Sequence, residues 1–185
     1  MNPLTTRHGR CPAAALLAVV MLLAWLAPQA KAQYSETEVK AGFIRNFAQL
    51  SKWPAKAFSD SNAPFTIGIF GDDSLGATLG KACQGQSASG RKISIKRTRQ
   101  VEDLKNCQLV FISKSDRGRV SEILSSFPGA NILTVGEGEQ FTRVDGGTIG
   151  ILIQEGQTPR FEIKLSAARG VDVSPLLKLG KIVRQ

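Results

Sequence analysis

The sequence predicts an α/β fold in a single domain. A mainly parallel sheet is expected with helices on both faces, followed by a C-terminal β-hairpin and a terminal helix. Short segments that are apolar throughout alternate with segments of helical period, as in parallel strands buried on both faces. The pattern changes near residue 148, where two strand-like segments are separated only by the turn sequence QEGQTP. These two observations predict the fold class.

The first helix is expected at residues 36–52. Ser35 and Glu38 have the spacing of a capping box, and Trp53-Pro54 ends the helix. Apolar residues recur along it at helical spacing, at Val39, Phe43, Phe47 and Leu50.

The next elements read strand, helix, strand, strand, helix, strand. The strands are expected at 65–70, 91–97, 109–113 and 131–135. One helix is expected at 75–83, and Ser115 is expected to cap the other, which Pro128-Gly129 ends. The hairpin is expected at 148–153 and 160–165, and Ser174-Pro175 has the form of a helix start.

The N-terminal residues 1–32 have the features of a cleaved secretory signal peptide. Arg7 and Arg10 precede an apolar run from Ala13 to Ala27, which is too short to span a bilayer comfortably. Cleavage is expected after Ala32, which leaves residues 33–185 as the mature domain. An uncleaved anchor is the alternative, although no stable membrane insertion of the mature chain is expected.

The composition of the mature chain limits the kinds of catalytic and metal-binding site that it can form. The single histidine, His8, leaves with the signal peptide, so histidine-based nucleophile pairs, general bases and metal sites are excluded. Removal of Arg7, Arg10 and Lys31 leaves 21 basic and 15 acidic residues, a net charge of +6. An enzyme is therefore not expected, and neither is a metal or another cofactor.

The mature chain keeps two cysteines, Cys83 and Cys107. An even number of cysteines in an exported protein usually forms disulfides, so a Cys83–Cys107 bridge is expected. A free thiol site or half of a metal site are the alternatives.

Polar residues follow three of the expected parallel strands. They are Asp72 and Asp73 after the first strand, Ser113, Lys114 and Ser115 at the end of the third, and Glu137 at the end of the fourth. Ligands bind beyond the carboxyl ends of such strands, so these loops are expected to share a crevice. The two aspartates disfavour a phosphate there. They are interpreted first as a turn and helix cap, and alternatively as a site for a cation or amine or as an acid–base pair.

Two segments are candidates for a partner surface. Basic residues cluster from Arg91 to Arg99, including Arg97, and they form either a solvated edge or a docking surface. Nucleic acid is not an expected partner, because the segment lacks aromatic residues for base stacking. The aromatic residues Phe43, Phe47 and Trp53, with Asn46 among them, form either core packing or an exposed partner-binding face.

The chain resembles the YfiR-like family of periplasmic proteins. The resemblance starts with KAGFIRNFAQLSKWP at 40–54, where Lys40, Phe43, Ile44, Asn46, Phe47, Trp53 and Pro54 match the family signature and Leu50 departs from it. It continues through GDDSLG, FISKS, LTVGEGEQF, GGTIG, FEIKLSAARG and LLKLGKIV, in order, over nearly the whole mature chain.

The resemblance implies a regulator without catalytic activity. The best understood member of the family holds an inner-membrane diguanylate cyclase inactive through the periplasmic sensor part of that cyclase. Its release, linked to redox state and envelope stress through disulfides, raises cyclic di-GMP and promotes exopolysaccharide production and biofilm. The resemblance also implies a homodimer and a Cys83–Cys107 pair. A periplasmic small-ligand receptor without enzymatic activity is the alternative function.

Overall fold

The computed structural model describes residues 34–71, 74–127 and 131–183. The predicted signal peptide and its cleavage site lie outside these ranges. Residues 34–185 form one compact unit. No helix among the described residues is long and apolar enough to cross a membrane.

The centre of this unit is an eight-stranded sheet in the order β2-β3-β1-β4-β5-β6-β7-β8. Neighbouring strands from β3 to β6 pair in parallel, β7 is antiparallel to β6, and β8 is parallel to β7. The predicted α/β class with a mainly parallel sheet and a β6–β7 hairpin is confirmed. The strands are β1 (Phe65–Phe70), β2 (Ser87–Ala88), β3 (Arg91–Thr98), β4 (Leu109–Ile112), β5 (Leu133–Glu137), β6 (Ile149–Leu152), β7 (Arg160–Lys164) and β8 (Lys181–Val183).

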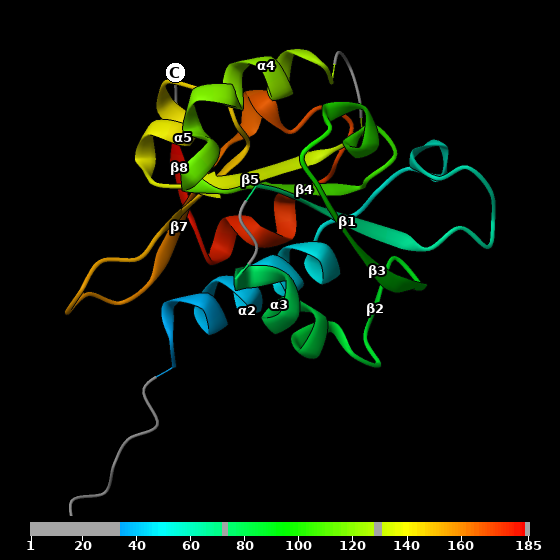
Figure 1. Ribbon diagram of the computed structural model, residues 1–185, viewed down its shortest axis with the longest axis horizontal. Coiled ribbons are helices and arrows are strands. Elements are labelled where there is room, and N and C mark those ends of the chain that lie inside the picture. The colour runs from blue at the N-terminus through cyan, green and yellow to red at the C-terminus, as the bar shows by residue number, and fades with distance from the viewer. Residues whose placement is uncertain (1–33, 72–73, 128–130, 184–185) are drawn as a thin grey trace, which may run out of the picture. The chain divides into compact units, whose positions relative to one another are not determined.

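Helices cover both faces of the sheet, as Figure 1 shows. Helices α2 (Glu36–Leu50) and α3 (Ser74–Cys83) pack on one face, and α4 (Val120–Ser125) and α5 (Glu139–Arg143) lie on the other. The side chains of β4 show why helices must pack on both faces of the sheet. Leu109 and Phe111 belong to the core under α2 and α3, whereas Val110 and Ile112 belong to the core under α4. Successive strand residues point to opposite faces, so an entirely apolar strand needs two cores.

Helix α2 begins at the predicted capping box. The Ser35 side chain accepts a hydrogen bond from the Glu38 backbone N–H, and the Ser35 backbone N–H donates to the Glu38 carboxylate at 2.8 Å. The hydrogen bonds from Ser35 lower the pKa of Glu38. The predicted apolar stripe is partly wrong, because Leu50 is exposed. The buried residues of the helix are Ala41, Ile44, Phe47 and Ala48.

The structure departs from the predicted elements in several places, including the two-residue strand β2. Helix α5 is not predicted, because it has only five residues. Ser113, not Ser115, caps the segment before α4, which is a 3₁₀ helix at Lys114–Arg119. The predicted terminal helix is a short 3₁₀ helix at Ser174–Lys178 followed by β8.

Candidate functional site

The loops after β1 and β4 meet at the carboxyl edge of the sheet. Gly71, the residue after β1, has φ +101°, and a side chain there would overlap the Asp116 carboxylate and lie close to Ser113. The Ser113 backbone N–H donates to the Phe70 carbonyl at 3.1 Å. The predicted convergence of these two loops is therefore present, and a side chain at position 71 would disturb it.

The predicted crevice residues are brought together in part. Ser115 Oγ lies 3.0 Å from Ser113 Oγ and 2.8 Å from Asp116 Oδ2, and the Ser115 backbone N–H donates to Ser113 Oγ at 3.4 Å. These contacts stabilise the start of the 3₁₀ helix, so both hydroxyls have a structural role. Asp72 and Asp73 lie outside the described residues, and their part in a crevice stays a prediction.

An ion-pair network joins the end of β5 to the start of α2. Lys40 Nζ lies 2.6 Å from Glu137 Oε2 and 2.6 Å from Glu36 Oε1. The other oxygen of Glu137 accepts a 3.2 Å hydrogen bond from the Lys114 backbone N–H. Burial acts to lower the pKa of Lys40, but the hydrogen bonds and charges of Glu137 and Glu36 outweigh burial, and its pKa is raised. Lys40 is therefore a charged, fixed link between α2, β5 and the loop after β4.

A cavity of about 380 Å³ lies beside this network. Its walls come from the start of α2 and from the loops after β4, β5 and β6. The predicted residues Ser113 and Ser115 do not line it, although their neighbour Lys114 does. The polar lining includes Lys40, Lys114, Arg117, Glu137, Glu139 and Gln154.

The sequence predicts part of this lining, because Lys114 and Glu137 lie in the loops that are expected to share a crevice. Lys40 enters the sequence interpretation only through its match to the family signature. Arg117 and Gln154 have no local pattern that distinguishes them from other exposed polar residues. Among the described residues, no group of three or more His, Cys, Asp or Glu side chains could hold a metal ion.

The predicted Cys83–Cys107 disulfide is wrong in this structure, where both cysteines are free and buried. Cys83 ends α3 and belongs to the core under α2 and α3, whereas Cys107 belongs to the core under α4. The sheet separates the two cores, so the sulfur atoms cannot reach bonding distance without disrupting the fold. Burial raises the pKa of the Cys83 thiol and raises that of Cys107 to about 11.

The predicted aromatic partner surface is also wrong for Phe47 and Trp53. Phe47 is 1% exposed and packs edge-on against Phe161, with ring centroids 4.8 Å apart. Trp53 is 9% exposed and packs edge-on against Phe65. Phe43 is half-buried, with its ring stacked on Phe47. These rings are core packing, which is the first of the two interpretations of the same pattern.

Asn46, Arg97 and Arg99 are exposed, as a partner surface requires. Helix α2 starts beside Glu137 at the carboxyl edge, and the segment after it reaches Gln108 at the opposite edge, so Asn46 lies toward that opposite edge. Arg99 follows the carboxyl end of β3. The three residues therefore do not lie together in one surface patch. Arg97 and Arg99 lie at the carboxyl edge of the sheet, and Asn46 does not.

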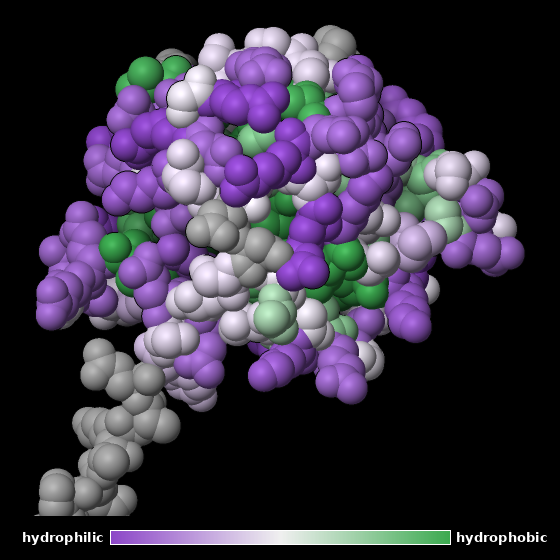
Figure 2. Space-filling view, in the orientation of Figure 1, coloured by the Kyte–Doolittle hydropathy of each residue, from purple (hydrophilic) through white to green (hydrophobic). Residues whose placement is uncertain are grey.

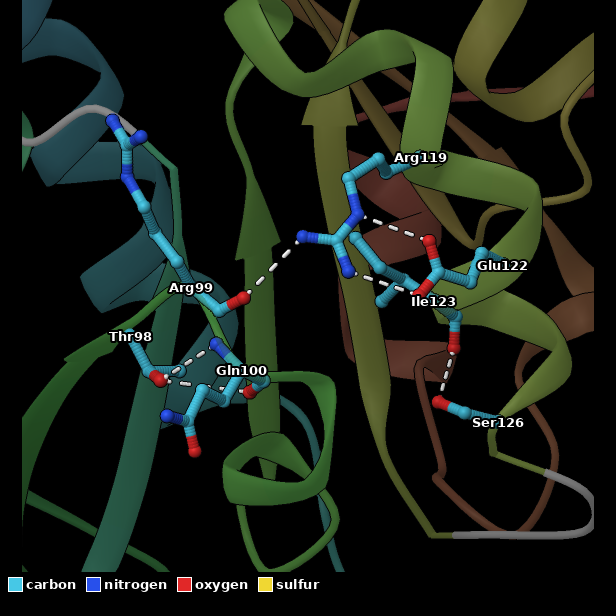
Figure 3. Close-up of polar contacts among 7 residues, drawn as sticks. All are labelled: Thr98, Arg99, Gln100, Arg119, Glu122, Ile123 and Ser126. Carbon is cyan, nitrogen blue, oxygen red and sulfur yellow. Dashed lines mark hydrogen bonds and ion pairs between the residues drawn. The ribbon is translucent and has the colours of Figure 1, made fainter.

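The backbone at Arg99 is held in place while its side chain points outward. Figure 3 shows Arg119 donating to the Arg99 carbonyl at 3.3 Å and pairing through two nitrogens with the Glu122 carboxylate. The Arg119 guanidinium also lies over the Phe70 ring, 4.9 Å from its centroid. Arg119 thus connects β1, the loop after β3 and α4, and it leaves the Arg99 guanidinium directed away from these contacts.

The face of the molecule in Figure 2 is mainly hydrophilic and carries only small, separate hydrophobic areas. A partner that docks on this face would therefore make largely polar contacts.

The comparison with protein families agrees with the succession of motifs along the chain. The sequence model of the YfiR/HmsC-like family matches residues 37–181, which span α2 to β8. The chain belongs to the YfiR/HmsC-like family. This family is periplasmic and is associated with the regulation of a diguanylate cyclase. No curated protein matches the chain.

Proposed function

We propose that this protein is a periplasmic regulator that inhibits an inner-membrane diguanylate cyclase. It acts on the periplasmic sensor part of the cyclase and lowers cyclic di-GMP, and with it exopolysaccharide production and biofilm. The observation that carries the proposal is the YfiR/HmsC-like family match over residues 37–181.

The composition of the chain supports a binding role. The proposed mature chain, residues 33–185, contains no histidine, so the commonest general base is missing. The two cysteines are buried with raised pKa values, which makes them poor nucleophiles near neutral pH. The proposed inhibition needs only a stable docking surface.

The proposed regulation does not use a disulfide between Cys83 and Cys107 as a switch. Cys83 and Cys107 lie in different cores on the two sides of the sheet. Release of the cyclase in response to envelope stress is therefore proposed to act through loss of docking, with both thiols reduced. A homodimer is part of the proposal as well, and sedimentation velocity of the purified protein tests it.

A deletion strain tests the regulatory proposal. Cyclic di-GMP in a cell extract is expected to rise when the gene is deleted and to return to its starting level when the full chain is supplied from a plasmid. The control is the same deletion in a strain whose candidate cyclase carries an inactivating change in its catalytic domain, where no rise is expected. Unchanged cyclic di-GMP in the first strain contradicts the proposal.

A second candidate function is a periplasmic receptor for a small ligand. The cavity of about 380 Å³ at the carboxyl edge favours it, because ligands of open parallel sheets bind at this edge. The two functions are compatible, since a ligand at the start of α2 can adjust docking. A thermal-shift screen with small metabolites tests the receptor function. A complete lack of stabilisation counts against it.

A further inference from the structure

The acidic and basic side chains that line the carboxyl-edge cavity differ in whether they have ion-pair partners. Its lining contains three carboxylates, and each already has a cationic partner. Glu36 and Glu137 both pair with Lys40, and Glu139 pairs with Arg143 at 2.8 Å. Each carboxylate is therefore held by a cation, although Lys40 serves Glu36 and Glu137 together and Arg143 also serves Glu162.

Two cations of the same lining have no such compensation. Lys114 and Arg117 both line the cavity, and neither side chain has a hydrogen-bond or ion-pair partner within the described part of the chain. Among the described residues, the charged groups that lack a partner at this cavity are therefore both cations, and they lie on one 3₁₀ helix.

The backbone of the segment that carries both cations is anchored at the cavity. The Lys114 N–H donates to Glu137, which is itself fixed by Lys40, so the start of the 3₁₀ helix is tied to the end of β5. Gly138 has φ +84°, and a Cβ atom there would lie 3.5 Å from Arg117 Nη2. The guanidinium thus lies against a residue without a side chain, on the wall of the cavity.

The rest of the lining limits the size and polarity of the ligand. Ile151, Leu152 and Ile153 add an apolar wall along the end of β6, and Gln154 adds an amide that can donate and accept hydrogen bonds. A ligand that fits has a small apolar body and one anionic group, which Lys114 and Arg117 can bind by charge-assisted hydrogen bonds.

We propose that this cavity binds a small organic anion, a carboxylate or a phosphate, through Lys114 and Arg117. This inference rests on the receptor function proposed above and is independent of the inhibition of a cyclase. It also differs from the cation or amine that the sequence suggests as an alternative at Asp72 and Asp73.

Four probes of similar size and different charge test the proposal. They are benzoate, phenyl phosphate, benzamidine and benzyl alcohol. Each is titrated at millimolar concentration into protein purified from the periplasmic fraction after expression of the full chain. Backbone amide shifts in NMR spectra report where the probe binds. We expect benzoate or phenyl phosphate to shift the amides of Lys114, Gly138 and Ile153, and benzamidine and benzyl alcohol to leave them unchanged.

A double variant identifies the residues that carry the binding. Lys114→Gln with Arg117→Gln is expected to weaken anion binding at least about tenfold, because two charge-assisted hydrogen bonds are lost. The matched control is Lys178→Gln with Arg169→Gln, which removes the same charge from residues that do not line the cavity. It is expected to leave the affinity unchanged. Thermal unfolding midpoints confirm that both double variants fold.

Several outcomes would overturn the proposal. Shifts from benzamidine at this cavity, without shifts from either anion, would keep a receptor but reverse the charge of its ligand. Anions that bind elsewhere, that do not bind at all, or that bind the double variant as tightly would each reject the site. None of these results bears on cyclase inhibition, which the deletion strain decides separately.

Discussion

Trp53 Nε1 donates a 3.1 Å hydrogen bond to the main-chain carbonyl of Gln108. This bond links the segment after α2 to the start of β4, two segments that lie far apart in the sequence. The same carbonyl accepts a second hydrogen bond from the Leu133 backbone N–H at 2.9 Å. The tryptophan that follows this amphipathic helix is thus explained by packing and hydrogen bonding within the domain.

Replacing Trp53 separates the hydrogen bond from the packing. Trp53→Phe should lower the free energy of unfolding by about 1 kcal/mol, because the Gln108 carbonyl keeps its bond from Leu133. Trp53→Ala should lower it by about 3–5 kcal/mol, because it also leaves a cavity against Phe65. Urea unfolding followed by circular dichroism measures both. Equal effects of the two changes would show that packing contributes little.

Glu162 is a buried carboxylate that is paired with Arg143. It is 1% exposed, and the Arg143 guanidinium binds both of its oxygens. Arg143→Ala should lower the free energy of unfolding by about 3 kcal/mol, because Lys181, at 3.7 Å, compensates only in part. Arg143→Met combined with Glu162→Leu should recover most of that loss, since the uncompensated charge is then absent. Thermal unfolding compares the single and double variants. A double variant as unstable as the single one would contradict this explanation.

The turn at Gly71 should not tolerate a side chain. Gly71→Ala would combine a positive φ with overlap of the Asp116 carboxylate, and it should destabilise the protein by more than about 2 kcal/mol. Gly90→Ala is the matched control. Gly90 has φ +72° but nothing within 4 Å of its Cβ position, so only the backbone cost of about 1 kcal/mol is expected. Similar effects at both positions would show that the loops can move apart freely.

The raised pKa of Cys107 predicts a pH dependence of stability. The folded state holds the thiol proton up to a pKa of about 11, whereas the ordinary value is 9.0, because burial disfavours the thiolate. The stabilisation is complete below pH 9 and is lost as the pH rises toward 11. The free energy of unfolding should therefore fall more steeply over this range in the wild-type protein than in Cys107→Ala. Parallel pH dependences of the two proteins would contradict the prediction.

Arg99 is the exposed cation best suited to test docking on the proposed cyclase. Only its backbone carbonyl is used by Arg119, so a new side chain should leave that contact intact. Arg99→Glu is expected to raise cellular cyclic di-GMP toward the deletion level at unchanged protein abundance, because charge reversal disrupts polar docking. Lys178→Glu is the control for a general effect of charge. Full repression by Arg99→Glu would remove this residue from the docking surface.

The parallel strands were predictable because their signal is local. LVFI at 109–112 is apolar at every position, which is typical of a strand that is buried on both faces of a sheet. Helix α5 gives no such signal, because five residues do not establish a period. Strand β8 depends on pairing with β7, a contact between segments that local sequence does not reveal.

The candidate site was less predictable because it depends on contacts between segments that are distant in the sequence. The topology of the sheet places the loops after β1 and β4 together, and the alternation of strands and helices was enough to predict this. The cavity depends on Lys40, which α2 contributes from outside the strand loops, and on its pairing with Glu137. For the cysteines, an even number favoured a bridge, but a count carries no information on which face of the sheet each residue occupies.

The two buried thiols lie on opposite sides of the sheet, one beneath each helical layer. The reactivity of each thiol can therefore report local opening of the helical layer that covers it. In a Cys107→Ala protein, the rate at which a thiol reagent modifies Cys83 reports transient opening of the α2–α3 layer. In a Cys83→Ala protein, modification of Cys107 reports opening on the α4 side. Equal protection would describe a domain that opens as one unit, and unequal protection would reveal which layer separates first.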